Sequence, residues 1–231
     1  MGGGSSEGVK WRTHSCVPRR DSSRRLLGVR NQTPLVHYLG MISRRRLPHV
    51  YPEGRALFVT WHLHGSLPFP LPTPPRKLTS GQAFVWLDRR LDSARTGPMY
   101  LRQPAIAEIV IDSIHKGVEL GHFELSAYVV MPNHVHLLIL PRVAPDRLMK
   151  SLKGSTAREA NRVLKRTGEP FWQKESYDHW VRDHQEFENI RAYIENNPVK
   201  AGLVRTPQEF PWSSAGVERS LDAARTSACA T

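Results

Sequence analysis

Two apolar runs joined by a short turn constrain the fold of this chain more than any other feature. Residues 125–130 and 134–140 are typical of strands, and the three residues between these runs are few enough to connect a hairpin. In the second run, His134 and His136 flank a single valine. Successive side chains on a strand point to opposite faces, so both imidazoles lie on one face. The sequence predicts a buried hairpin whose histidine pair is either half of a metal site or a pair of histidines that are hydrogen-bonded in the core or face solvent.

The remaining pattern supplies one more strand and three helices. A strand is predicted over 56–64, an amphipathic helix over 104–116, a basic helix over 145–166 that Gly154-Ser155 can break in two, and a helix over 184–197. This order of elements favours an α+β fold. We expect a ferredoxin-like antiparallel sheet with helices packed on one face.

Charge and composition indicate one domain with extensions. We predict a flexible basic arm over 1–48, a domain over 49–212 with a proline-rich insertion at 66–80, and a flexible tail over 213–231. The net charge is +12, and residues 1–50 hold ten Lys or Arg against Glu7 and Asp21. Such a block of basic residues predicts a nucleic-acid partner, with a solvated basic face as the alternative.

Other functional classes find little support. No apolar run reaches the ~18 to 20 residues that a membrane span needs. The basic N-terminus is not followed by the hydrophobic core that a signal peptide requires. We therefore expect a cytoplasmic protein without a membrane partner. Cys16 and Cys229 stand near opposite ends of the chain. Their placement argues against a disulfide framework and against a cysteine zinc site.

The helix over 184–197 adds two candidate residues. Tyr193 and Asn197 are four apart, so they share a face and can approach the same ion. The alternatives are a packed amphipathic tyrosine and an ordinary helix-stop asparagine before a proline. His62 and His64 repeat the His-x-His spacing and form a rival pair, for which strand packing or DNA contact is the other interpretation. Ligand type leaves zinc, manganese and magnesium open.

Four motifs in order resemble one family. They are PNHVHLLI at 132–139, FWQ at 171–173, YDHWVRD at 177–183 and AYIENNPVKAGLV at 192–204. Together they resemble the REP-associated tyrosine transposases, IS200-like single-tyrosine enzymes of the HUH nuclease superfamily, over about residues 50–212. The resemblance implies an HUH nuclease core.

The resemblance also implies roles for the residues found above. His134 and His136 would bind a divalent metal, Mg²⁺ or Mn²⁺, and Asn197 would complete its shell. Tyr193 would be the nucleophile. Such enzymes cleave and rejoin single-stranded DNA near palindromic hairpins through a covalent 5′-phosphotyrosine. The implied location is the nucleoid of a bacterial cytoplasm.

Two other functions stay open. One is a catalytically silent protein that binds hairpin DNA, and the other is a histidine-metal phosphoesterase in which water attacks. For DNA contact we select Lys150, Lys153 and Arg158 on the basic helix, together with Arg182. Trp172, Tyr177 and Trp180 are candidates for base stacking or for the core. The protein is either a monomer or a homodimer, with Tyr193 acting in cis or in trans.

Overall fold

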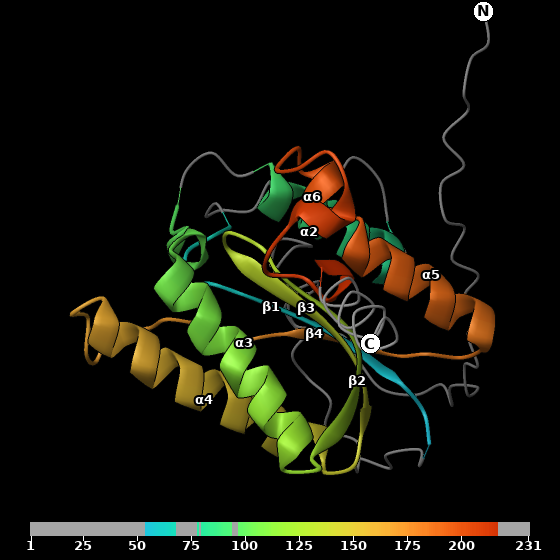
Figure 1. The fold of residues 1–231 in the computed structure, drawn as a ribbon, viewed down its shortest axis with the longest axis horizontal. Coiled ribbons are helices and arrows are strands. Elements are labelled where there is room, and N and C mark those ends of the chain that lie inside the picture. The colour runs from blue at the N-terminus through green and yellow to red at the C-terminus, as the bar shows by residue number, and fades with distance from the viewer. Residues whose placement is uncertain (1–53, 68–77, 79, 94–96, 217–231) are drawn as a thin grey trace, which may run out of the picture.

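The computed structural model describes residues 54–67, 78, 80–93 and 97–216 (Figure 1). The predicted basic arm lies outside the described residues, as do most of the proline-rich insertion and most of the predicted tail. Within the described part of the chain, no helix is both long enough and apolar enough to cross a bilayer.

A four-stranded antiparallel sheet forms the centre of the fold. Its strand order is β2-β3-β1-β4, and the strands are β1 (Leu57–His62), β2 (Phe123–Val130), β3 (His134–Pro141) and β4 (Tyr177–Trp180). The predicted hairpin is β2-β3. Pairing between β1 and β3 sets Thr60 opposite His136 and His62 opposite His134. The edge strand β4 was not predicted from the sequence.

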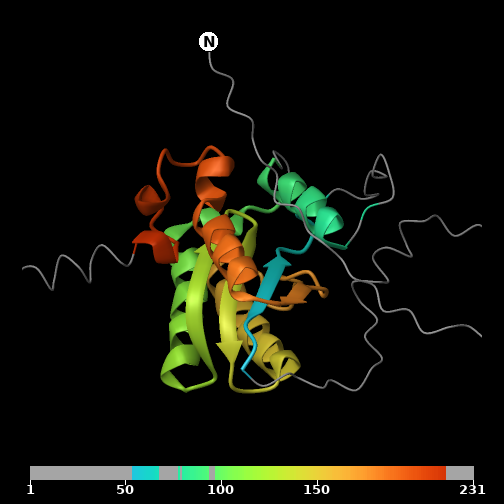
Figure 2. The same ribbon diagram turned by 90° about the vertical axis from the view of Figure 1, so that its right-hand side faces the viewer.

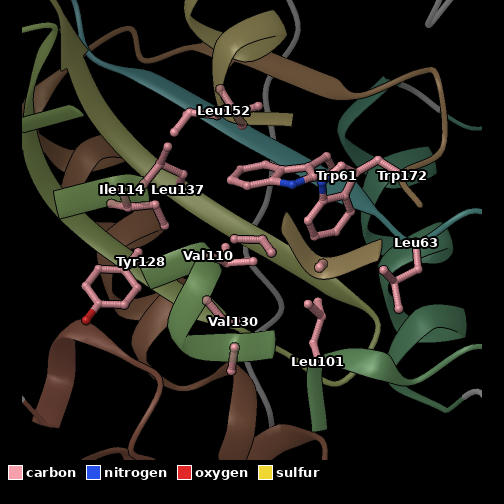
Figure 3. Close-up of a cluster of buried hydrophobic side chains, with 14 of the residues drawn as sticks. Trp61, Leu63, Leu101, Val110, Ile114, Tyr128, Val130, Leu137, Leu152 and Trp172 are labelled. Carbon is pink, nitrogen blue, oxygen red and sulfur yellow. The ribbon is translucent and has the colours of Figure 1, made fainter. Parts of the chain in front are cut away.

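One face of the sheet is covered by two helices, α3 (Pro104–Glu119) and α4 (Pro145–Val163). Figure 3 shows the core between them and the sheet, where Trp61 and Leu137 from the strands meet Val110 from α3 and Leu152 from α4. The predicted division of α4 at Gly154-Ser155 is wrong, because the helix runs through both residues without a break.

The other face is covered by α2 (Ser80–Asp92) and α5 (His184–Glu195), with the short α6 (Asn197–Lys200) following α5 (Figures 1 and 2). Here Phe58 and Leu138 from the sheet pack with Phe84 from α2 and Ile190 from α5. The predicted α+β class with an antiparallel sheet is confirmed. The expectation that helices pack on one face only is wrong, because the central strands carry apolar residues on both faces and both need a covering layer.

The start of α5 follows the pattern expected from its sequence. The Asp183 side chain accepts a hydrogen bond of 2.8 Å from the backbone N–H of Glu186, which caps the helix. The end differs, since α5 stops at Glu195 and Asn197 begins α6. Two 3-10 turns, Tyr100–Arg102 and Pro207–Glu209, complete the described elements.

Candidate active site

The two histidines of β3 lie buried on the face covered by α2 and α5. His134 and His136 are both 0% exposed, and their Nε2 atoms are 3.0 Å apart. Burial lowers the pKa of each imidazole to about 3, since a charged ring would lose its hydration there. Both rings are therefore neutral at physiological pH, which is the state in which imidazole binds metal ions.

Hydrogen bonds on the outer side of each ring orient the pair. The Asn133 amide nitrogen donates to the Leu91 carbonyl at 2.9 Å, which turns its oxygen toward His134 Nδ1 at 2.7 Å. His134 Nδ1 therefore carries the proton, and its Nε2 presents a lone pair. His136 Nδ1 lies 2.7 Å from the Thr60 hydroxyl. These contacts direct both Nε2 atoms toward one point, the arrangement of a paired metal ligand.

A carboxylate from α2 completes a cluster of three ligands. Asp88 Oδ1 lies 3.3 Å from His136 Nε2 and 3.7 Å from His134 Nε2. Among the described residues, this aspartate and the two histidines form the one group of potential ligand atoms that all lie within 4.8 Å of one another. Burial raises the pKa of Asp88, and Coulombic attraction to His134 opposes that shift.

Unsatisfied oxygens around the cluster fit a divalent cation. Within the described residues, the Oδ1 atoms of Asp88, Asp92 and Asn197 are buried without a hydrogen-bond partner. A buried oxygen without a donor costs free energy unless something else pairs with it. Two imidazole nitrogens and several oxygens that converge in one buried place are a donor set suited to a divalent metal.

Tyr193 reaches this cluster from α5. Its hydroxyl donates a hydrogen bond to Asp88 Oδ2, and its ring lies edge-on to the His136 ring with centroids 5.8 Å apart. The Lys200 ammonium sits 4.4 Å from the centre of the tyrosine ring. Burial and the neighbouring carboxylate raise the pKa of the Tyr193 phenol. The phenol is therefore protonated in this state and needs a base before it can act as a nucleophile.

The structure brings together all four residues that the sequence singled out. Asn197 is fully buried, with its amide nitrogen 3.3 Å from His136 Nε2 and 3.5 Å from Asp88 Oδ2. It thus contacts the same two groups that Tyr193 contacts, although it belongs to α6. The roles of Tyr193, His134, His136 and Asn197 stay predictions at this point.

The rival histidine pair is not part of the cluster in the described structure. His62 Nδ1 lies 2.8 Å from the Ser66 hydroxyl and 3.1 Å from the Leu63 carbonyl. Burial lowers the pKa of His62 to about 4. His64 is exposed in the turn after β1. Both histidines thus have local positions that account for them without an ion.

Two of the predicted DNA-contacting residues lie on the face of the sheet opposite the cluster. Lys150 and Arg158 are exposed on α4, which covers the opposite face of the sheet (Figure 2). The Lys153 ammonium donates to the carbonyls of Gln173 and Lys174 at 2.8 and 2.9 Å. Arg182 is exposed and forms an ion pair of 2.7 Å with Glu186.

The aromatic candidates divide between two environments. Trp172 is a core residue, buried against Trp61, and its indole N–H donates to the Thr156 hydroxyl at 2.9 Å. Tyr177 stacks on Phe84 with ring centroids 4.4 Å apart and is partly exposed. Trp180 is also partly exposed.

Asp88 is the member of the cluster that the sequence reasoning missed. Asp88 lies on α2, a helix that follows the proline-rich insertion and was not predicted from the sequence. A signal was present, since Phe84, Asp88 and Asp92 recur at intervals of four and therefore share one helix face. Two acids on the same face as a buried phenylalanine indicate a helix that carries carboxylates into an interior.

Fold and site define the chain as an α+β protein with a candidate histidine-carboxylate metal centre beside a tyrosine hydroxyl. Residues 99–197 match the family described as Transposase IS200 like. A stretch of 103 residues is 30% identical to a REP-associated tyrosine transposase of Haemophilus influenzae, covering 40% of this chain and 58% of that relative. This segment thus resembles the IS200-like transposases, and the expected resemblance to REP-associated tyrosine transposases is confirmed over it.

Two further similarities complete the comparison. A REP-associated tyrosine transposase of Escherichia coli K12 is 30% identical over 95 residues, which is 40% of this chain and 54% of the relative. The chain therefore matches little more than half the length of these relatives. A solved structure of a REP-associated tyrosine transposase bound to a REP hairpin is 19% identical and covers 77% of this chain and 86% of that one, with a TM-score of 0.46.

Proposed function

We propose that this protein is a metal-dependent transposase that cleaves and rejoins single-stranded DNA near palindromic hairpins. Tyr193 is the nucleophile and carries a covalent 5′-phosphotyrosine between the two steps. The observation that carries the proposal is the contact of the Tyr193 hydroxyl with Asp88, whose other oxygen faces His136 Nε2 at 3.3 Å. The family match over residues 99–197 and the names of the relatives support a DNA partner.

The residues present fit a divalent ion, Mg²⁺ or Mn²⁺. His134 and His136 would hold it through Nε2, with Asp88 and Asn197 supplying the oxygens that lack hydrogen-bond partners within the described residues. When bound, such an ion neutralises negative charge on the non-bridging oxygens of a phosphodiester and makes the phosphorus more electrophilic. Asn133 and Thr60 keep the imidazoles oriented through their Nδ1 atoms.

The chain's own groups account for the proton transfer. Asp88 accepts the hydrogen bond from Tyr193, so it is placed to take the phenol proton as the oxygen attacks phosphorus. The new bond joins the tyrosine oxygen to phosphorus, the bond to the 3′ oxygen breaks, and that oxygen leaves with a proton as a free hydroxyl. Attack by a 3′-hydroxyl on the phosphotyrosine reverses these events and joins strands without ATP.

Lys200 supports the same step from the other side of the ring. Its ammonium lies 4.4 Å from the ring centre, and Coulombic attraction toward Asp88 and Asp92 acts on it. A cation there stabilises negative charge on the tyrosine oxygen and on an approaching phosphate.

The exposed basic residues Lys150 and Arg158 bind phosphates along α4, and we assign Lys153 and Arg182 to the same task after they leave their present partners. Replacing any one of these phosphate-binding side chains by alanine should reduce the slope of log affinity against log salt by about 0.7 to 0.9. The α4 part of this surface lies on the opposite face of the sheet from Tyr193, whereas Arg182 pairs with Glu186 of α5 on the same face as Tyr193. The α4 part is therefore suited to the part of the DNA that is bound but not cleaved.

The test uses a hairpin oligonucleotide from the DNA around the gene, with single-stranded flanks and a label at either end. The protein is incubated with it and Mn²⁺, and covalent complexes are separated under denaturing conditions. The proposal expects an adduct with the strand 3′ of the cut and none with Tyr193→Phe. Cleavage that persists in Tyr193→Phe would favour the water-using phosphoesterase, and binding without cleavage would favour the silent DNA-binding protein.

A further inference from the structure

A cleft of about 440 Å³ opens beside the metal-ligand cluster, on a side that the proposed chemistry has not used. It is walled by the end of α2, the β2-β3 turn, the first 3-10 turn and the segment after α6, and His134 and Asp92 lie in its lining. Pockets of about 300 to 1,000 Å³ hold small organic ligands, so this one has room for a single nucleotide.

The lining of the cleft suits a nucleotide. The half-buried Met99 and the exposed Leu203 supply apolar surface for the flat faces of a base, and the buried Met131 lines the cleft from the core. Arg102 adds an exposed guanidinium, a group that pairs with phosphate oxygens. An apolar wall and a cation beside the metal-ligand cluster are contacts that suit one nucleotide of a single strand.

The cleft and the nucleophile approach the cluster from different sides. Tyr193 contacts Asp88 and the ring of His136. The cleft is lined by His134 and Asp92, and neither Tyr193 nor His136 is in its lining. Asp92 Oδ1 lies 3.7 Å from His134 Nε2, so the floor of the cleft borders the metal ligands directly.

The geometry of in-line displacement indicates which nucleotide the cleft holds. When an oxygen attacks phosphorus, the leaving oxygen departs on the opposite side. The tyrosine becomes bonded to the 5′-phosphate, so the departing group is the 3′ oxygen of the preceding nucleotide. We propose that this cleft holds the nucleotide bearing the leaving 3′ oxygen and retains it as a free 3′-hydroxyl for the joining step. The inference rests on the proposed function, because it needs Tyr193 as the attacking group.

Photo-crosslinking tests the assignment with the full-length Tyr193→Phe protein, which performs no covalent step of its own. Two random-sequence single-stranded octamer pools carry 5-iodo-2′-deoxyuridine, either at the 3′-terminal or at the 5′-terminal nucleotide. Peptides joined to DNA are then identified by mass spectrometry. We expect the 3′-terminal pool to label the peptides that contain Met99 and Leu203, on the order of tenfold more than the 5′-terminal pool.

A charge-matched pair of variants isolates the cleft. Leu203→Glu places a carboxylate in it, and Leu120→Glu places one on a leucine that is 57% exposed between α3 and α4. Both side chains are partly exposed, so neither change removes core packing. The 3′-directed crosslink should fall about tenfold in Leu203→Glu and stay unchanged in Leu120→Glu.

Equal labelling of these peptides by both pools, or labelling by the 5′-terminal pool alone, would overturn the assignment. If wild-type protein forms the Tyr193 adduct with hairpin DNA but the cleft is never labelled, the cleft inference is wrong and the proposed function stands. A 3′-directed label without any adduct would support the nucleotide site and contradict the tyrosine chemistry.

Discussion

The Tyr193 hydroxyl donates its hydrogen bond to a carboxylate that lies 105 residues earlier in the chain, that of Asp88. One oxygen of this carboxylate accepts from the phenol, and the other faces His136 Nε2 at 3.3 Å. A single side chain from α2 thereby links the nucleophile to the histidine pair. The link explains why α2 has to cover this face of the sheet.

Replacing Asp88 by Asn tests that link. The amide keeps the size of the side chain but cannot take the phenol proton, and it is a weaker metal ligand. We expect the rate of covalent-adduct formation to fall by about 100-fold or more. Asp112→Asn is the control, since Asp112 is an exposed carboxylate on α3, which covers the opposite face of the sheet, and it should keep the wild-type rate. An unchanged rate in Asp88→Asn would remove the proton acceptor from the proposal.

Metal binding should stabilise the protein through the β3 histidines and not through the β1 histidine. At an Mn²⁺ concentration of about 100 times Kd, binding contributes about 2.7 kcal/mol, which raises Tm by about 5 to 10 °C in a protein of this size. His136→Gln should abolish this rise, and His62→Gln should retain it. The midpoint of each metal-free variant is measured first in EDTA. A lost rise in His62→Gln would place that residue in the metal site.

The sequence predicted the elements that have strong local patterns. The β2-β3 hairpin and α3 carry long apolar periods, and both were expected near their observed bounds. The strand β4 has four residues, all half-buried, so its formation depends on pairing with β1 more than on its own pattern. The second covered face was missed because α2 was missed.

For the site, the family motifs directed attention to His134, His136, Tyr193 and Asn197, and the fold brings these four together. Asp88 belongs to none of those motifs. Its position depends on a long-range contact between α2 and α5, and no local pattern encodes such a contact. Its burial beside the two histidines becomes visible only once the helices are packed on the sheet.

The packing of α3 on β2 predicts a stability difference between two helical glycines. A Cβ on Gly117 would lie 2.4 Å from Cε1 of Phe123, a buried ring with little room to move. Gly117→Ala should therefore destabilise the fold by about 1 to 3 kcal/mol. Gly154→Ala meets nothing within 4 Å and should stabilise α4 by about 1 kcal/mol through helix propensity. Urea unfolding of both variants measures the sign of each change in the free energy of unfolding. A stabilising Gly117→Ala would contradict the packing.

The lowered pKa of Lys153 predicts that the stability of the fold depends on pH. Burial lowers its pKa from 10.5 to about 8, so between these values the unfolded chain binds more protons than the folded one. The contribution of Lys153 to the free energy of unfolding therefore increases as pH rises from about 8 to 10.5. Relative to Lys153→Met, the wild type should gain about 1 to 2 kcal/mol over this range. Denaturant unfolding of both proteins at pH 7, 8.5 and 10 follows the difference, and a constant difference would refute the shift.

Peptide mapping of the protein–DNA adduct tests the central claim most directly. Wild-type protein is reacted with the hairpin oligonucleotide and Mn²⁺, digested with nuclease and protease, and analysed by tandem mass spectrometry. The account predicts a 5′-phosphonucleotide on the oxygen of Tyr193, absent when His136 is replaced by Gln. A nucleotide attached to another residue, or cleaved DNA with every tyrosine unmodified, would contradict it.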